Sequence, residues 1–538
     1  MPVDMPPVDH TPLQLQQSTI QDEIRLEAKG FLYTVRGNTL LPEDAIKAIL
    51  NQAENPLQAA RLIREAYAKK GYVLVNVQPS VSGNYAIFLV QEYRITRIEG
   101  PEYAKIYMSS LINRKDVLQA EFNRKLANAL NEAARKGERL EYRLNPSTTR
   151  EGEVDLILEP KKVAELKTQN ASIAFSNYGN RYVGRYYGVT NFQLHPGYGS
   201  EVNVGVNQLA EDFGDTPNHA NYTGANIDVS KTTRWGVFGA GYNFITYHYP
   251  NGELYINPAL PGCSEQNINA CLYLQDVIQD GEIHFWNLNA SHILYVTPTF
   301  QWSISERFDH VDHSLNSRSG YSLQAEHYNM LSLTSSFAHF FQSLGQQATL
   351  NYNLGITKGL SGNTGTLGVI NSYGGAAQGS FWIGKFDLGY SQPLPWRFTN
   401  QTTLRSQFAS KTLPQDQQFF LGGFENLSAW MPGAAVGDHG YILSNRLFFP
   451  QQRWFDIEIT PFIFAENGGV RYNTSPYRNS WTYMTDAGGG LSVNVKKLGT
   501  VYLTAAGPIG QKDYKEPDQN DERSDVYFYV GLNYGFTP

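Results

Sequence analysis

The sequence has few charged residues, and it lacks a long apolar segment. Charged side chains make up 17% of its 538 residues, against roughly 25% in an ordinary soluble protein. No run approaches the roughly 18 consecutive apolar residues of a membrane-spanning helix, and the mean hydropathy is −0.39. The net charge is −7, and no basic stripe accompanies it, which argues against a nucleic-acid-binding protein. These absences exclude a helical membrane protein and make nucleic acid an improbable partner.

Cysteine is also scarce, and the catalytic motifs are missing. The chain has two cysteines, Cys263 and Cys271, in a polar stretch without histidine neighbours, so they cannot supply the four ligands of a structural zinc site. In an oxidising compartment they could form a small disulfide-closed loop. No nucleophile elbow, phosphate-binding loop or carboxylate pair is present. We therefore expect neither an enzyme nor a cofactor.

One short segment has metal-ligating residue types. It reads Asp309-His310-x-Asp312-His313. On a β-strand, two residues three positions apart point to opposite faces, so His310 and His313 would not share an ion. The sequence therefore predicts no metal site, and it predicts that these side chains are solvated in a loop or in a barrel interior.

Aromatic residues and glycine are abundant, and from about residue 163 they follow a period of two. Aromatic residues make up 13% of the chain and include 34 Tyr, and there are 48 Gly. Residues 347–356 and 526–536 alternate apolar with polar or small side chains, which is typical of a membrane β-barrel with a wet interior. About 375 residues, at roughly 22–24 for each strand and connection, give near sixteen antiparallel strands. A secreted soluble β-protein is the competing interpretation.

The first part of the chain has a different pattern. A strand is expected at 24–35, helices at about 43–50 and 56–70, and strands at 72–77 and 85–92, and the same order recurs up to residue 158. We therefore predict a mixed α and β protein in four parts. They are an N-terminal segment (1–20), two α+β domains (21–92 and 93–162) and a transmembrane antiparallel β-barrel (163–538).

A glycine-rich insert at 420–446 interrupts the barrel pattern. Connections as long as this one are usually functional or disordered. It contains Gly422-Gly423, aromatic residues at Phe424 and Trp430, and then Gly437-Asp438-His439-Gly440. The regular glycine and aromatic spacing indicates an ordered, functional loop.

Five stretches, in order, resemble the FhaC/ShlB-type (TpsB) transporters of two-partner secretion, within the BamA-like superfamily of outer-membrane assembly proteins. Residues 31–42 are similar to the opening of the family's first POTRA domain, 145–156 to the end of its second, 420–446 to its sixth extracellular loop, 464–468 to the strand motif that this loop meets, and 529–536 to a barrel-assembly signal. The resemblance spans about residues 25–536. On it, the inserted loop comprises Gly422, Gly423, Phe424, Leu427, Ser428, Ala429, Trp430, Asp438 and Gly440, and the barrel-wall partners are Phe464, Glu466 and Gly468.

The resemblance implies an ATP-independent pore in the bacterial outer membrane. Its periplasmic POTRA domains would capture an unfolded exoprotein, and folding outside the cell would supply the energy. The barrel-assembly machinery would insert the barrel into the lipid bilayer. In this family an N-terminal helix often plugs the pore, but residues 1–20 are short and proline-rich, so we do not expect one. They also show no signal peptide, so the numbering would begin in a mature or re-engineered chain.

The chain departs from the family at the loop tip and at its partner. The family usually has Val-Arg-Gly followed by Tyr or Phe where this sequence has residues 427–430, and Asp where it has Glu466. A serine at position 428 cannot make the bidentate contact of an arginine with a carboxylate. We therefore expect Glu466 to pair with Arg446 or Arg471, or the loop to be held by packing of Trp430.

Two other functions stay open on the sequence. One is an assembly factor for outer-membrane proteins, which would cause defects in many of them. The other is a passive or ligand-gated pore, which would conduct small solutes without a protein client.

Overall fold

A computed structural model describes residues 23–536, apart from 73, 136–137, 147–151, 163–168, 180–185, 198–199, 211–220, 234, 257–271, 298, 318–321, 361–369, 372–374, 474–479, 497–498 and 513–525. The chain forms two compact units. One is built mainly from residues up to Lys167, and the other contains most of the chain from Thr168 onward. Cys263 and Cys271, the expected disulfide pair, lie outside the described residues.

The N-terminal unit begins with a four-stranded sheet and two helices. Its elements are β1 (Glu23–Ala28), β2 (Phe31–Arg36), α1 (Glu43–Gln52), α2 (Pro56–Lys69), β3 (Val75–Ser82) and β4 (Tyr85–Glu92). The strand order is β1-β2-β4-β3, with β2 and β4 parallel. The single strand expected at 24–35 was wrong, because Lys29 and Gly30 have positive φ values of 50° and 80° and turn the chain into a hairpin.

The core of this sheet lies under its helices. Ile46 and Leu50 of α1, Ile63 of α2 and Phe88 of β4 are fully buried in one apolar cluster. Asn55 caps α2, since its side chain accepts the Gln58 N–H. These contacts explain why the helical spacing in the sequence was a reliable signal.

A buried carboxylate joins the end of β4 to the connection after β2. Glu92 accepts N–H groups from Thr39 and Leu40 at 2.8 and 2.9 Å, and the Tyr67 hydroxyl at 2.8 Å. Burial and the nearby Glu92 charge raise the pKa of Tyr67. At Gly37, φ is +82°, and a Cβ atom would lie 2.3 Å from the Val90 carbonyl oxygen, so glycine is needed for the chain to pass β4 here.

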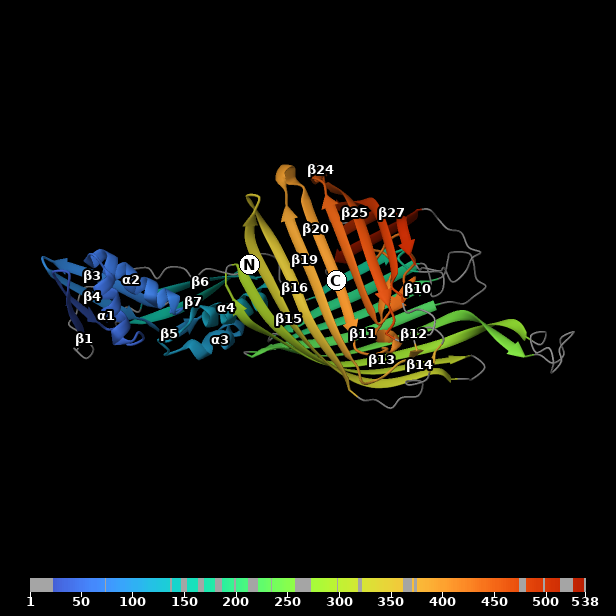
Figure 1. Cartoon of the computed structure of the whole chain (residues 1–538), viewed down its shortest axis with the longest axis horizontal. Helices are drawn as coiled ribbons and strands as arrows, with labels where there is room; N and C mark the ends of the chain where they lie inside the picture. Colours follow the sequence, from blue (N-terminus) through green and yellow to red (C-terminus); the bar gives the residue numbers. More distant parts are fainter. Residues whose placement is uncertain are drawn as a thin grey trace. The chain divides into compact units, whose positions relative to one another are not determined.

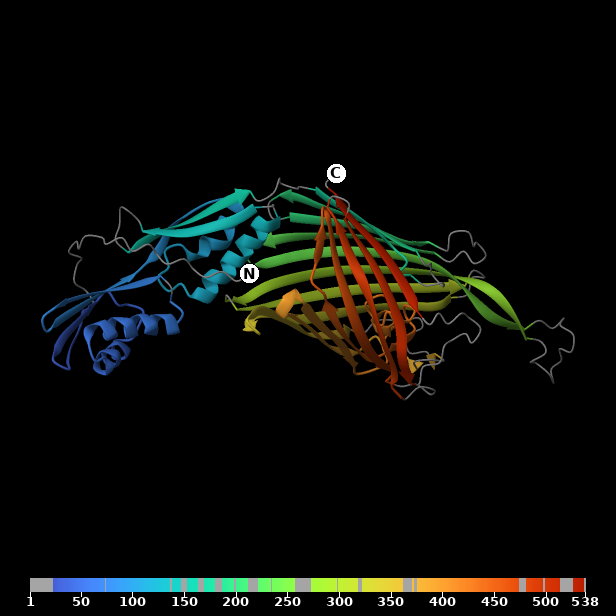
Figure 2. The same ribbon diagram turned by 90° about the horizontal axis from the view of Figure 1, so that it is seen from above.

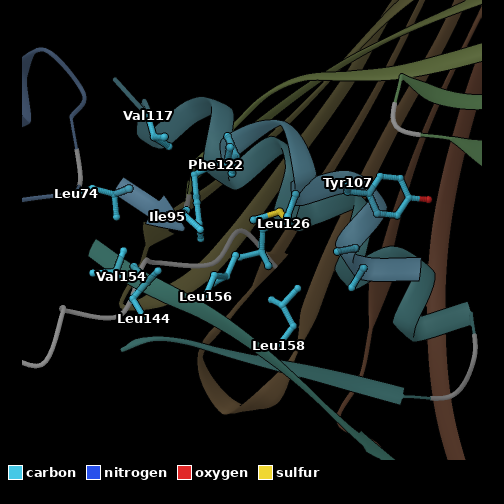
Figure 3. Close-up of a cluster of buried hydrophobic side chains, with 14 of the residues drawn as sticks. Leu74, Ile95, Tyr107, Val117, Phe122, Leu126, Leu144, Val154, Leu156 and Leu158 are labelled. Carbon is cyan, nitrogen blue, oxygen red and sulfur yellow. The ribbon is translucent and has the colours of Figure 1, made fainter. Parts of the chain in front are cut away.

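A second sheet with its own helices follows in the same unit. Its elements are β5 (Arg94–Glu99), α3 (Glu102–Met108), the 3₁₀ turn η1 (Ser109–Leu111), α4 (Gln119–Arg135), β6 (Glu138–Pro146) and β7 (Glu153–Lys162), with strand order β5-β7-β6. Phe122 and Leu126 of α4 face Val154 and Leu156 of β7 across the core (Figure 3).

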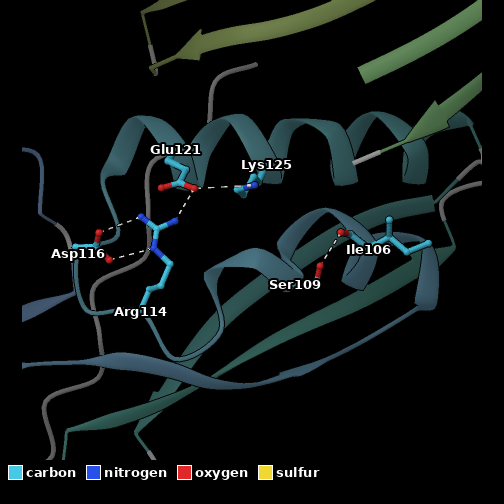
Figure 4. Close-up of polar contacts among 6 residues, drawn as sticks. All are labelled: Ile106, Ser109, Arg114, Asp116, Glu121 and Lys125. Atoms are coloured by element: carbon cyan, nitrogen blue, oxygen red, sulfur yellow. Dashed lines mark hydrogen bonds and ion pairs between the residues drawn. The ribbon is translucent and has the colours of Figure 1, made fainter. Parts of the chain in front are cut away.

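Arg114 holds the connection that leads into α4. Its Nε donates to Asp116 Oδ1 at 3.0 Å and its Nη1 donates to Glu121 Oε1 at 2.9 Å (Figure 4). The hydrogen bond from Arg114 lowers the pKa of the Asp116 carboxyl. The charge-assisted pairs fix the entry of the helix.

The C-terminal unit is a closed antiparallel barrel. In the described residues its strands are β8 (Gln169–Ser176), β9 (Tyr186–Gly197), β10 (Ser200–Ala210), β11 (Asn221–Thr233), β12 (Gly236–Ile256), β13 (Leu272–Val296), β14 (Phe300–Ser317), β15 (Ser322–Ser343), β16 (Gln346–Leu360), β19 (Trp382–Pro393), β20 (Thr399–Ala409), β23 (His439–Phe448), β25 (Ile457–Arg471), β26 (Thr482–Val495), β27 (Gly499–Lys512) and β28 (Tyr527–Phe536), with the three-residue β24 (Gln452–Trp454) in one turn. The prediction of sixteen strands is confirmed (Figure 1).

The last strand closes the barrel against the first. Phe536 of β28 pairs with Ala171 of β8, and Gly531 pairs with Ser176, as the adjacent red and teal ribbons in Figure 2 indicate. Asn177 extends this seam, because its amide donates to the Phe528 carbonyl and accepts the Val530 N–H, both at 2.8 Å. The segment 529–536 that resembles a barrel-assembly signal is therefore the closing strand.

The two faces of the barrel strands differ in polarity. On β16, Leu354 and Ile356 are 50% and 48% exposed, while Asn351 and Asn353 line an interior cavity. An apolar outer face suits contact with acyl chains, and a polar inner face suits water. Large aromatics at the tight turns, Trp396 and Trp454, are 85% and 69% exposed, as expected at a membrane interface.

Short elements complete the fold. They are β17 (Ile370–Asn371), β18 (Gly375–Ala376), η3 (Pro395–Arg397), η4 (Gln415–Gln417), β21 (Phe419–Leu421) and β22 (Ala435–Gly437). Within the part of the chain that the structure describes, none of the helices has the length and apolar character needed to cross a bilayer.

Candidate functional site: an ordered loop against the barrel wall

The connection between β20 and β23 folds into an ordered loop. Its two arms, β21 and β22, pair with each other, Phe419 opposite Gly437 and Leu421 opposite Ala435. The glycine frame noted in the sequence makes the turn possible. Gly422 and Gly423 both have φ of +100°, and a Cβ atom on Gly422 would lie 1.9 Å from the Met431 carbonyl oxygen.

Backbone hydrogen bonds shape the loop tip. The Gly422 N–H donates to the Asn426 carbonyl at 2.7 Å, and the Gly423 N–H donates to the Trp430 carbonyl at 2.8 Å. Asn426 is held in turn by Arg405 of β20, whose Nη2 donates to its Oδ1 at 2.9 Å. The tip is therefore a defined structure.

Two carboxylates of the barrel wall receive the tip. Glu466 Oε2 on β25 accepts both the N–H and the hydroxyl of Ser428, at 2.9 and 3.0 Å, and its Oε1 accepts the Ser444 hydroxyl at 3.1 Å. Asp486 Oδ2 on β26 accepts the Ala429 N–H at 2.7 Å. Glu466 and Asp486 are 1% and 0% exposed and lie opposite each other in the strand register. Together they hold two successive backbone N–H groups.

The expected pairing of Glu466 with an arginine was wrong. Arg446 donates instead to Glu425 of the loop at 2.7 Å, and its guanidinium lies 5.0 Å from the centre of the Phe462 ring. Arg471 lies over Trp481. A carboxylate that accepts three hydrogen bonds from Ser428 and Ser444 has little need of a cation, and this is why the arginine can be absent.

The alternative expectation, packing of Trp430, agrees with the structure. Trp430 is 5% exposed and belongs to an apolar cluster with Leu427, Ala429 and Phe464. Gly468 on β25 makes room for this cluster, because a Cβ atom there would lie 2.9 Å from both Leu421 Cδ2 and Leu427 Cδ1. The predicted wall residues Phe464, Glu466 and Gly468 thus share one face of β25.

Glycines on β26 accommodate the phenylalanines of β25. A Cβ atom on Gly488 would lie 2.6 Å from Phe464 Cζ, and one on Gly490 would lie 2.6 Å from Phe462 Cζ. Both phenylalanines are buried, whereas Ile463 between them is 50% exposed. The two phenylalanine rings therefore pack closely against β26 on the inner face of the barrel wall, beside the loop.

Asp438 closes the base of the loop. It is fully buried, and its two oxygens accept the N–H groups of Leu413 and Asn473, both at 2.8 Å. Gly440 leaves space for the Phe419 ring, since a Cβ atom would lie 2.2 Å from Phe419 Cδ1. The base is thus joined to the segments on both sides of it.

Phe424 connects the loop to the closing seam. Its ring stacks on Tyr178 at 4.2 Å between centroids and lies 5.5 Å from the ring of Tyr529 on β28. A cavity of about 790 Å³ remains beside the loop, with Asn353, Asp387 and Arg405 among its lining residues. The loop occupies part of the interior and leaves next to it a cavity with polar and apolar lining residues.

One site residue was missed from the sequence, namely Asp486. Its partner, Ala429, comes from a different segment, so spacing along the chain could not reveal the contact. A usable signal was its face, because it shares the inward side of β26 with Gly488 and Gly490. His310 and His313, in contrast, contact different partners, Asn329 and Asp416, as strand alternation requires. The expectation that these side chains are solvated was wrong for Asp309 and His313, which are 5% and 2% exposed because neighbouring elements cover them.

Comparison with known proteins gives a matching family model and a related transporter. Residues 244–495 match the model of the haemolysin secretion/activation protein family ShlB/FhaC/HecB. The heme/hemopexin transporter protein HuxB of Haemophilus influenzae is 23% identical over 370 residues, which are 66% of this chain and 59% of that protein. The chain thus spans 59% of the length of this curated relative.

Solved structures that share the fold include CdiB from two organisms. CdiB from Escherichia coli superposes with a TM-score of 0.73 at 16% identity, over 99% of this chain and 94% of that one. CdiB from Acinetobacter baumannii has a TM-score of 0.68 at 16% identity over the same shares. At these identities the likeness concerns the arrangement of the barrel and of the elements that precede it.

Proposed function

We propose, from the premise that this chain is an outer-membrane barrel of the ShlB/FhaC/HecB (TpsB) type, that it exports a partner protein by two-partner secretion. The observation that carries the proposal is the hydrogen-bonded contact of the loop tip with Glu466 and Asp486 inside a closed barrel. A loop held by a few hydrogen bonds can occupy the interior in one state and leave it in another.

The partner would be captured by the N-terminal unit. We assign residues 21–92 and 93–162 to two POTRA domains in the periplasm. An extended client can add as a strand to an open sheet edge, with its backbone hydrogen bonds supplying affinity that tolerates many sequences. β1 and β3 are the edge strands of the first sheet. Beside the edge strand β3, Tyr85 of β4 is 61% exposed and would supply apolar contact area.

Translocation would then need the loop to move. Polar side chains line part of the cavity beside the loop, which has a volume of about 790 Å³. If Ser428 and Ala429 were released from Glu466 and Asp486, the loop could move away and widen the open part of the barrel interior. Folding of the client outside would make the passage irreversible without ATP.

Reversible cross-linking tests the movement. Ser428→Cys and Ser444→Cys, whose native hydroxyls both contact Glu466, would be combined with Cys263→Ser and Cys271→Ser. A short bis-thiosulfonate reagent should join the loop to β23 and stop secretion of the partner protein, and a reductant should restore it. Each single-cysteine variant, treated in the same way, is the control.

Three outcomes would redirect the proposal. Undiminished secretion from the cross-linked protein would show that the loop need not move. Normal secretion in cells that lack this chain, with altered uptake of small solutes, would favour a passive pore. Depletion of many outer-membrane proteins in those cells would favour an assembly factor.

A further inference from the structure

Three potential metal ligands meet where the loop begins. They come from three elements, His313 of β14, Glu326 of β15 and Asp416 of η4, and their ligating atoms all lie within 4.8 Å of one another. His313 Nδ1 is 3.1 Å from Asp416 Oδ2. An ion about 2.1 Å from each ligand in a tetrahedral site would separate the ligand atoms by roughly 3.4 Å. The distance between His313 and Asp416 is therefore close to that expected at a bound ion, and the limit of 4.8 Å leaves Glu326 within reach of the same ion after a small side-chain movement.

The cluster is buried, and one of its oxygens lacks a partner. His313 and Glu326 are 2% and 5% exposed, and Asp416 has a side-chain exposure of 11%. Glu326 Oε2 is buried without a hydrogen bond. Among the described residues, Asp416 forms an ion pair with His313. Two ionised carboxylates and one neutral imidazole carry a net negative charge, and in a buried site this charge is costly unless a cation or protons neutralise it.

The histidine is oriented as a metal ligand usually is. Its Nε2, the nitrogen away from the cluster, is 2.8 Å from the Tyr247 hydroxyl, so Nδ1 can carry its lone pair toward the carboxylates. A ligating histidine almost always uses its second nitrogen in this way. Gly281 makes space for the tyrosine, because a Cβ atom there would lie 2.1 Å from Tyr247 Cζ.

We propose that His313, Glu326 and Asp416 bind a divalent transition-metal ion, best matched by Zn²⁺, which joins the start of the loop to the barrel wall. One imidazole and two carboxylates suit zinc and its neighbours better than Ca²⁺ or Mg²⁺, which take oxygen ligands alone. The Gln324 amide, whose Nε2 is 3.3 Å from His313 Nδ1, could turn its oxygen inward as a fourth ligand. Water could fill that position equally well.

The ion would act on the loop at a point different from the tip. Asp416 lies in η4, directly before β21, and the neighbouring Gln417 donates to the Tyr328 hydroxyl of β15 at 3.2 Å. The tip, in contrast, contacts β25 and β26. A metal at His313 would therefore hold the first arm of the loop to β14 and β15 whether or not the tip is released.

Titration of the purified full-length protein tests the site without reference to export. After chelation and removal of the chelator, the protein in detergent should bind one equivalent of Zn²⁺ by calorimetry. Co²⁺ should give visible bands of nitrogen and oxygen ligation. Glu326→Gln and Asp416→Asn should abolish this binding, and Tyr247→Phe should weaken it about 10-fold to 100-fold. Ca²⁺ should not compete.

A matched control separates the site from adventitious binding. His310→Ala removes the other histidine of the same strand, which contacts Asn329, and should bind Zn²⁺ as the parent protein does. Heat-modifiable mobility on gels checks that each variant is folded. His313→Ala should also abolish Zn²⁺ binding. If that variant does not fold, the loss of binding in Glu326→Gln and Asp416→Asn tests the site. Absence of stoichiometric binding to the parent protein, or equal binding by Glu326→Gln, would overturn the proposal.

Discussion

At the scale of single residues, the loop tip is held by wall carboxylates that accept backbone N–H groups. Glu466 and Asp486 reach the N–H groups of Ser428 and Ala429. A hydrogen bond to a charged group contributes about 1.5–3 kcal/mol. The contact therefore depends more on the wall side chains than on the identity of the loop side chains.

Removal of the Glu466 charge should loosen the tip. In Glu466→Gln the amide keeps the size of the side chain, but it accepts fewer hydrogen bonds and its NH₂ group opposes the Ser428 donors. We expect a loss of about 1–3 kcal/mol in the free energy that holds the tip, seen as more frequent openings in planar-bilayer recordings. Glu458→Gln on the same strand, where the carboxylate is partly exposed, is the control. An equal effect of the two variants would contradict the assignment.

An arginine at position 428 should not fit this wall. Ser428 and Glu466 are each 1% exposed, so Ser428→Arg alone should destabilise the loop by about 1–3 kcal/mol through overpacking. Adding Glu466→Asp shortens the wall side chain and should recover most of the loss. A double-mutant cycle of thermal unfolding in detergent measures the coupling. Additive effects would mean that the two positions do not compensate each other.

At the scale of elements, glycines on β25 and β26 set how closely the loop can approach. Gly468 faces Leu421 and Leu427, and Gly488 faces Phe464. Each leaves a space that a neighbouring side chain fills. The loop can therefore pack closely against β25 and β26 because these glycines have no Cβ atom.

Filling one of these spaces should displace the loop and leave the barrel intact. Gly468→Ala places a methyl group 2.9 Å from two leucine methyls, which should cost about 1–3 kcal/mol and raise the labelling rate of a cysteine at 428. Gly389→Ala on β19, where the added Cβ atom has nothing within 4 Å, should have little effect. Leu427→Ala should relieve Gly468→Ala, and failure to do so would place the strain elsewhere.

The Glu92 network should make the first sheet sensitive to alkali. The pKa of Tyr67 is raised above its ordinary value of 10.0 by burial and by Glu92. Since the unfolded chain loses this proton first, the stabilisation is complete below pH 10 and falls as the pH rises further. Tyr67→Phe should reduce this decline in far-ultraviolet circular dichroism melts from pH 9 to pH 11. An unchanged slope would assign the decline to other groups.

The helices and strands were easier to predict than the tertiary contacts between them. Helical spacing located α1 and α2, and alternation located the barrel strands, because both signals are local. The β1–β2 hairpin was missed because Lys29-Gly30 lies in a continuous strand-like segment without Pro, Asn or Asp to mark a turn. Glu466 came from resemblance, whereas Asp486 and the cluster of His313, Glu326 and Asp416 form only when distant strands become neighbours in the closed barrel.

At the scale of the whole molecule, the barrel is a self-contained ring. Its strands pair with one another from β8 round to β28, and the sheets of the N-terminal unit are separate. Among the described residues, no strand of the preceding sheets is part of the ring. The proposed capture of a client and the formation of the barrel can thus be separated by experiment.

Deletion of residues 23–162 should therefore spare the barrel and abolish export. We expect the shortened chain to reach the outer membrane and to show heat-modifiable mobility, while the partner protein disappears from the medium. Overall outer-membrane protein content, measured by quantitative mass spectrometry, should be unchanged. Continued secretion would remove the N-terminal unit from the capture role.

The use of backbone N–H groups at the loop tip has a consequence for divergence. Every residue except proline offers an N–H, so positions 428 and 429 can drift through many small side chains while the contact persists. Glu466 and Asp486 have no such freedom. A saturation mutagenesis library selected for export should accordingly keep the two strand positions nearly fixed and let the loop positions vary, with proline excluded at both.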